Sequence, residues 1–327
     1  MIRGIVFGSM PRTRRIARAL SRLQSGKISE DQMNEIYRRD LKKFLEYIYT
    51  NNIHRSSDGM YRWDDLFNPL SHYMNIEVDG LKRFYDNNFF FRQPVFNKTI
   101  YYPEPKISKI LIEDLRSIGY IERIDRISLS LPGPLTLAAN SLINEGIYSS
   151  KISLARDYVE KVILEEITSG SKEGLRHIDL HEPELAFTSP SEDFIELYKR
   201  ISEIFSGSIW IIIYFGYNRE SIESLRKISA GGRIIPVIDL VSNKLLSKDA
   251  IEKIYRDLAG FHEIGLGVID SRNTKIEKTR EIRELIERLE SYLKDTEHIY
   301  VTHNTNLEFL PEKVALRKIK LISRLYE

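Results

Sequence analysis

Eight short apolar runs recur along the chain, and most of them end in a polar residue, a glycine or a proline before a helical pattern begins. A strand followed by a helix, repeated eight times, predicts an α/β fold of the (β/α)8 TIM-barrel type. Functional groups in such barrels gather at the C-terminal ends of the strands, so the residues that end each run are the candidates for function. The runs are Arg3–Gly8, Asn52–Asp58, Arg126–Leu131, Leu175–His181, Ser208–Phe215, Arg233–Asp239, Glu263–Asp270 and His298–His303.

One barrel domain accounts for the length of the chain. It has 327 residues, of which 42% are hydrophobic, and a barrel of this type takes about 250 residues. We therefore expect a single domain over residues 1–327 with an insertion at about 61–120, between the second and third strands. Aromatic and β-branched residues flank Asp86, Asn87 and Asn88 there and predict a β-hairpin. The hairpin would form a lid or binding wall, or else cover apolar surface or mediate self-association.

Several helices can be placed from local signals. Ser29 and Gln32 form a capping-box pattern, which predicts a helix to about Thr50. An earlier helix begins near Pro11, since proline suits a first helical turn. Further helices are expected over residues 134–146 and 151–168, and the last begins at Pro311-Glu312.

Charge and composition exclude several classes of function. Lys and Arg number 49 against 47 Asp and Glu, and this balance lacks the basic excess of a nucleic-acid-binding protein. The Arg-rich segment Pro11–Arg22 has helical spacing and is interpreted as a solvated or partner-facing helix. The chain has no cysteine, which excludes disulfides, thiolate catalysis and Cys-ligated zinc.

Location follows from the same data. The first residues do not form a signal peptide and no run reaches about 20 apolar residues, so we expect a cytoplasmic protein without a membrane segment. Charged residues make up 29% of the chain, and this bias is typical of proteins from hot environments.

The fourth run alternates, so His177, Asp179 and His181 share one face, which we expect to line the barrel lumen near its mouth. Neighbouring positions on one strand rarely converge on one ion, so a polar lumen that contacts a ligand is favoured over a metal site, and we predict no metal. Glu182 follows and either binds a ligand or caps the next helix. The other strand ends add groups of both charge signs, suited to an amino-acid-like or acidic ligand; the planar fork of Arg12 would suit a carboxylate or phosphate.

Motifs along nearly the whole chain resemble cobalamin-independent methionine synthase and its shorter archaeal relatives. They are Gly8-Ser9-Met10-Pro11-Arg12, Ser57-Asp58-Gly59 with Arg62-Trp63, Asp86-Asn87-Asn88, Pro132-Gly133-Pro134-Leu135-Thr136, Glu182-Pro183, Tyr214-Phe215-Gly216, Gly265-Leu266-Gly267-Val268-Ile269-Asp270 and Asn304–Leu307. The family has two related (β/α)8 barrels, and the insertion with Asp86-Asn87-Asn88 and Arg92-Gln93-Pro94 looks like that of the N-terminal one.

The resemblance fails where the family binds zinc. The family's catalytic barrel holds zinc through a His, two Cys and a Glu, and the metal activates the homocysteine thiol for methylation by a folate-type donor. In this chain the His-x-Cys positions read Ile212 and Tyr214, and Asp-Cys-Gly reads Asn304-Thr305-Asn306. The family's Asp-Gly-Glu motif reads Asp58-Gly59-Met60, and its Asp-Glu-Pro motif reads His181-Glu182-Pro183. Ile, Tyr and Thr cannot replace a histidine and two thiolates around zinc.

The resemblance therefore implies an N-terminal-type barrel that acts with a separate zinc-bearing barrel in methyl transfer to homocysteine. It would bind the methyl donor, hold no cofactor tightly and not be catalytic alone; folate, a methanopterin-like pterin and a methylcorrinoid remain open as donors. On this hypothesis Gly8, Ser9 and Arg12 contact donor or partner, Asp58, Arg62, Trp63, Asp86 and Asn87 form the lid side, and the mouth is lined by His181, Glu182, Asp239, Asp270, His303 and Asn304.

Two other classes of function stay open. One is a stand-alone, zinc-independent enzyme of the wider superfamily that includes uroporphyrinogen decarboxylase and corrinoid-dependent methyltransferases. The other is a non-enzymatic binding or assembly protein.

Overall fold

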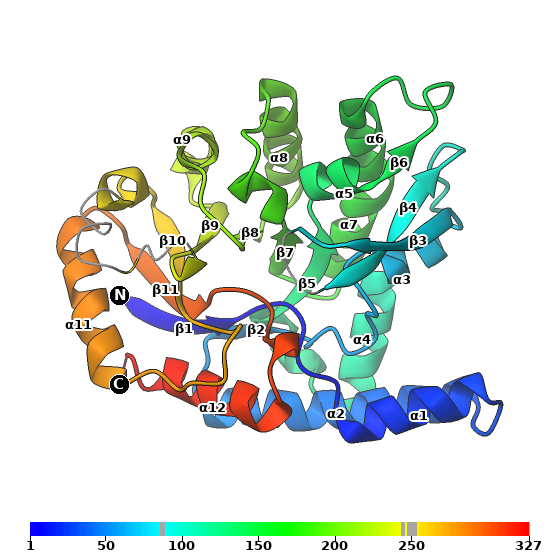
Figure 1. Ribbon diagram of the computed structural model, residues 1–327, viewed down its shortest axis with the longest axis horizontal. Coiled ribbons are helices and arrows are strands. Elements are labelled where there is room, and N and C mark those ends of the chain that lie inside the picture. Colours follow the sequence, from blue (N-terminus) through cyan, green and yellow to red (C-terminus); the bar gives the residue numbers. More distant parts are fainter. Residues whose placement is uncertain (86–88, 243–245, 247–253, 327) are drawn as a thin grey trace.

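The protein is described by a computed structural model that covers residues 1–85, 89–242, 246 and 254–326. Within these residues, eight parallel strands close into a barrel in the order β1-β11-β10-β9-β8-β7-β5-β2 (Figure 1). Each predicted apolar run overlaps one of these strands, so the predicted fold class is confirmed. The strands are β1 (Ile2–Val6), β2 (Arg55–Ser57), β5 (Ile127–Pro132), β7 (His177–His181), β8 (Ser208–Ile213), β9 (Ile234–Asp239), β10 (Glu263–Ile269) and β11 (His298–His303).

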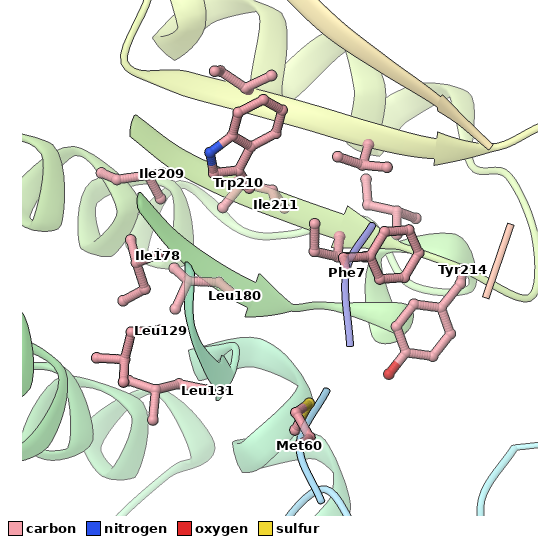
Figure 2. Close-up of a cluster of buried hydrophobic side chains, with 14 of the residues drawn as sticks. Phe7, Met60, Leu129, Leu131, Ile178, Leu180, Ile209, Trp210, Ile211 and Tyr214 are labelled. Atoms are coloured by element: carbon pink, nitrogen blue, oxygen red, sulfur yellow. The ribbon is translucent and has the colours of Figure 1, made fainter. Parts of the chain in front are cut away.

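The core lies between the barrel strands and the helices around them. Alternate residues of a strand point to opposite faces, and the aliphatic face of β5, β7 and β8 packs outward against helices (Figure 2). Its side chains are almost fully buried: Leu129, Leu131, Ile178, Leu180, Ile209 and Ile211. The opposite face of the same strands supplies the polar lumen described below.

Helices cover the outside of the barrel (Figure 1). The capping box at Ser29 is confirmed, because its hydroxyl accepts from Gln32 N and the Gln32 side chain accepts from Ser29 N. None of the described helices is both long and apolar enough to cross a membrane. The helices are α1 (Arg14–Gln24), α2 (Glu30–Thr50), α3 (Asn68–Tyr73), α4 (Ile107–Ile118), α5 (Pro134–Asn140), α6 (Lys151–Tyr158), α7 (Leu164–Lys172), α8 (Glu192–Ile204), α9 (Arg219–Ile228), α11 (Thr279–Tyr292) and α12 (Glu312–Ser323).

The hairpin predicted in the insertion is confirmed. Strands β3 (Glu77–Arg83) and β4 (Phe90–Phe96) pair antiparallel and form a three-stranded sheet with β6 (Leu142–Ile143). The predicted turn at Asp86, Asn87 and Asn88 lies outside the described residues.

The helix predicted over residues 134–146 is wrong in its second half. The helix α5 ends at Asn140, Ser141 is extended, and β6 then pairs with β4 through Val95 and Leu142. Pairing with a strand from the distant insertion overrides the local helical pattern. The helix predicted over residues 151–168 is present as α6, a π-helical turn at Val159–Ile163 and α7.

Candidate functional site

A buried ion pair occupies the lumen below the barrel mouth. The guanidinium of Arg55 on β2 donates to Asp179 on β7 at 2.7 Å, and both side chains are fully buried. Arg55 also donates to Ser128 and lies 3.9 Å from the ring centroid of Trp210. As predicted, the polar face of β7 lines the lumen.

These contacts separate the three polar residues of β7. Asp179 is engaged by Arg55, whereas Nδ1 of His177 accepts from the indole N–H of Trp210 at 3.3 Å. In the described part of the chain, no group of three or more His, Cys, Asp or Glu side chains is arranged to hold a metal ion.

Four aromatic rings form the floor of the mouth: Phe7, His181, Tyr214 and His303, which we call the mouth floor. The ring of Phe7 lies 4.3 Å from that of His303 and 6.2 Å from that of His181, and His181 lies 6.0 Å from Tyr214. They come from the ends of β1, β7, β8 and β11; Figure 2 shows Tyr214 beyond the end of β8. Residues far apart in sequence thus meet where a barrel places its site.

The two histidines of the floor are neutral. Burial lowers the pKa of His181 to about 3, with the nearby charge of Arg55 as the second cause, and burial lowers the pKa of His303 to about 4. Nδ1 of His303 bonds the carbonyl of Thr305 at 2.8 Å, and its Nε2 accepts from Phe7 N.

His181 differs from His303. Among the described residues, neither of its ring nitrogens has a hydrogen-bond partner, although the side chain is fully buried. The neutral ring offers one donor and one acceptor, so His181 has free capacity for a ligand's polar groups.

Glu182, directly after His181, is fully satisfied. Its carboxylate accepts from Leu135 N at 3.0 Å, Thr136 N at 2.8 Å and the hydroxyl of Tyr198 at 2.5 Å. Burial raises its pKa to about 7. Glu182 therefore caps the N-terminus of α5, a helix that precedes it in the chain, rather than the following helix as one of the two sequence interpretations had it.

Asp239 likewise holds loops together. Its oxygens accept from Val241 N, Ser242 N, Phe215 N and the amide of Asn304. Asn304 in turn accepts from Ser271 N at 2.9 Å. This network joins the loops after β8, β9, β10 and β11 and holds Phe215 in a left-handed conformation (φ 75°), which costs energy outside glycine. We call Glu182, Asp239, Asn304 and Ser271 the rim.

Asp270 lies outside this network. It accepts from Arg272 N at 2.8 Å and from the side-chain amide of Asn273 at 2.9 Å, within its own turn.

The loop after β1 brings backbone to the mouth. Gly8 has φ 65°, and a side chain there would overlap Asn306, whose oxygen accepts from Ser9 N. Arg12 donates to Trp63 O at 2.7 Å and to Asp64 at 2.5 Å, so its guanidinium ties two loops together.

The predicted lid residues take separate positions. Burial raises the pKa of Asp58 to about 6, and its carboxylate accepts from Met60 N. Arg62 points away from the mouth and donates to Asp114 and Asn34. Trp63 lines the mouth pocket, while Asp86 and Asn87 lie outside the described residues.

A pocket, the mouth pocket, lies between the insertion and the barrel and reaches the mouth floor at Tyr214. Ser9, Tyr214 and Asn306 line its barrel side. Burial raises the pKa of Glu308 on its wall to about 7. Besides Tyr214, the aromatic side chains that line the pocket are Trp63, Phe84, Phe89, Phe90, Phe91 and Phe309.

Several of these residues were missed from the sequence. Glu308 and Phe309 directly follow the matched motif Asn304–Leu307, and Phe89, Phe90 and Phe91 form an aromatic run beside the predicted hairpin turn. The aromatic run was a usable signal, because exposed aromatic clusters on a lid indicate a binding wall.

Known proteins align with this chain over nearly its whole length. No protein-family model matches. Methionine synthases of Sulfurisphaera tokodaii and Pyrococcus furiosus are 25% and 23% identical over 320 and 326 residues, and each alignment covers 96% of this chain and 88% of the relative. A B12-independent methionine synthase from Shewanella sp. W3-18-1, solved in complex with selenomethionine, superposes with a TM-score of 0.77 at 16% identity, covering 98% of this chain and 95% of that one. The solved structure shows a shared fold.

Proposed function

The chain is a distant homologue of the archaeal methionine synthases, and on this premise we propose that it takes part in methionine biosynthesis as the barrel that binds the methyl donor. A separate zinc-bearing barrel would supply the activated homocysteine thiolate. The observation that carries the proposal is the mouth pocket, with its aromatic walls above buried polar side chains that lack partners within the described residues.

Zinc does not fit the residues that replace its ligands. Ile212 is fully buried and has no donor atom, and Tyr214 presents a phenol whose pKa burial raises well above its usual value. The hydroxyl of Thr305 is a neutral donor where the family has a thiolate. Zinc sites in proteins use imidazole, thiolate and carboxylate ligands, so these three residues do not provide one.

The mouth pocket suits a methylated pterin. The flat faces of the heterocycle would stack on the phenylalanines and Trp63, and its N–H edge would meet the carboxyl group of Glu308 and the amide of Asn306. His181 below the pocket would orient the donor through its free ring nitrogens.

Titration calorimetry with a methylated pterin and with methylcobalamin tests this role. We expect the pterin to bind, and Glu308→Gln to weaken binding at least about tenfold, because a hydrogen bond to a charged group contributes about 1.5–3 kcal/mol. Glu284→Gln on the exposed face of α11 is the matched control and should bind as wild type. If neither donor binds, the proposed function is wrong.

An assay of methionine formation tests whether the chain needs a separate zinc-bearing barrel. The chain alone should form no methionine from homocysteine and a methylated pterin, and addition of a purified zinc-bearing barrel should start the reaction. Methionine formed by the chain alone would support the second candidate, a stand-alone enzyme. That candidate is favoured by one observation, namely that the alignment covers 88% of the methionine synthase of Sulfurisphaera tokodaii.

A further inference from the structure

A second, larger hollow lies beside the mouth pocket, separated from it by the contacts of Arg12 with Trp63 O and Asp64. It is a groove between the start of α1, the middle of α2 and the start of α12. Figure 1 shows these three helices together along one edge of the molecule. The groove is bordered by three helices and is open to solvent, so its shape suits a segment of polypeptide.

The groove is basic. Five cationic side chains line it against two carboxylates. Two of the cations are arginines already paired, with Asp64 and with Asp40. The other three, Arg14, Lys43 and Lys313, are exposed and make no ion pair with any described residue.

The positive charge extends along α1. Residues 1–29 contain no Asp or Glu, while Arg18, Arg22 and Lys27 continue the basic series beyond the groove. An uncompensated field of this kind steers acidic partners during encounter. The near balance of charge over the whole chain argues against nucleic acid as the occupant.

Buried contacts hold the walls in place. Asp40 is buried and accepts from the hydroxyl of Thr13 and from Arg15 at 2.7 Å, which fixes the start of α1 on α2. The hydroxyl of Tyr47 donates to Leu316 O at 2.9 Å and joins α2 to α12. A preformed groove reduces the ordering cost of binding.

The floor of the groove is apolar. Phe44 and Tyr61 meet edge to face with ring centroids 6.1 Å apart, and Met10 lies beside them. Basic side chains around an aromatic base match a segment in which carboxylates surround an apolar anchor. Anchors of that kind contribute most of the binding energy at interfaces.

We propose that this groove docks an acidic protein segment carrying an apolar anchor. The inference goes beyond donor binding, and it rests on the proposed function only for the identity of the partner as the zinc-bearing barrel.

Fluorescence anisotropy with a labelled Glu/Leu hexapeptide tests the groove. Wild type should bind the peptide, more weakly at about 300 mM than at about 50 mM NaCl because salt screens exposed charges. The variant R14Q/K43Q/K313Q should bind at least about fivefold more weakly. The matched control R18Q/R22Q/K27Q removes three cations of α1 and the turn after it that do not line the groove, and it should change affinity less than about twofold. Melting temperatures should be unchanged in both variants.

The proposal is overturned by no binding of the peptide to wild type, by equal binding to the triple variant, or by displacement by an equal concentration of tetraglutamate, which lacks the anchor. A Gln/Leu peptide that binds as well as the Glu/Leu peptide would also contradict it. The experiment uses neither methyl donor nor zinc protein, so its failure leaves the donor-binding role standing.

Discussion

At the rim of the barrel mouth, the carboxylate of Glu182 accepts three hydrogen bonds, whereas on the mouth floor the residue before it, His181, has no partner for either ring nitrogen within the described residues. A satisfied buried carboxylate stabilises the loops it joins. An unsatisfied buried polar group costs about 1–3 kcal/mol, and such groups persist where function compensates. Polar residues at strand ends thus divide into those whose hydrogen bonds hold the loops together and those that keep unpaired polar atoms.

The largest expected effect is at the rim. Glu182→Ala should lower the free energy of unfolding by about 3–5 kcal/mol, because two backbone N–H groups of α5 and the hydroxyl of Tyr198 lose their acceptor. Urea unfolding at constant pH measures the loss. Glu192→Ala, on the exposed first turn of α8, is the control and should cost about 1 kcal/mol or less. A loss below about 1 kcal/mol for Glu182→Ala would contradict the capping role.

The floor should respond to acid. The pKa of His181 is lowered from 6.5 to about 3, so the stability that depends on its neutral form is complete above pH 6.5 and is lost as the pH falls toward 3. The slope is about 1.4 kcal/mol per pH unit, or about 2 kcal/mol between pH 6.5 and 5. His181→Leu should remove this part of the acid sensitivity in urea titrations.

Tyr214→Phe, a floor variant that retains His181, should keep the wild-type slope. If His181→Leu unfolds with the same pH dependence as wild type, then His181 is charged or solvated in the folded protein, and the comparison with the rim fails.

The substitution His181→Leu also tests whether the mouth floor binds the methyl donor. At pH 7, His181→Leu should leave stability unchanged or slightly increased, because an unsatisfied polar group is replaced by an apolar one. Affinity for the methylated pterin should nevertheless fall at least about tenfold, or about 1.4 kcal/mol. Unchanged affinity in calorimetry would remove His181 from the proposed binding site.

Arg12 should show the smallest effect. The sequence suggested a ligand contact, but the guanidinium donates to Asp64 and Trp63 O with a third of the side chain exposed. Arg12→Ala should therefore cost about 0–1 kcal/mol of stability, with donor affinity close to wild type. A double-mutant cycle with Asp64→Ala measures the pair. A tenfold loss of donor affinity would return Arg12 to the binding site.

The barrel could be predicted because its signals are local. The apolar runs, the capping box at Ser29 and the hairpin each depend on residues close together in sequence. The strand β6 could not be predicted, since its partner β4 lies in the insertion some distance away.

The partners of the predicted site residues could not be predicted from the sequence. Glu182 was recognised as a strand-end carboxylate, yet the donors that satisfy it lie on α5, and those of Asp239 include a side chain from the last strand's loop. Such partners are set by closure of the barrel. Glu308 was missed for the same reason, because only the fold brings it beside Tyr214 and the insertion.

The chain has two tryptophans, and they lie in two different environments. Trp210 is buried in the lumen against Arg55, whereas Trp63 forms part of the wall of the mouth pocket. Intrinsic fluorescence therefore contains two separable signals. A Trp63→Phe chain reports on the integrity of the barrel alone, and a Trp210→Phe chain reports occupancy at the mouth without any label.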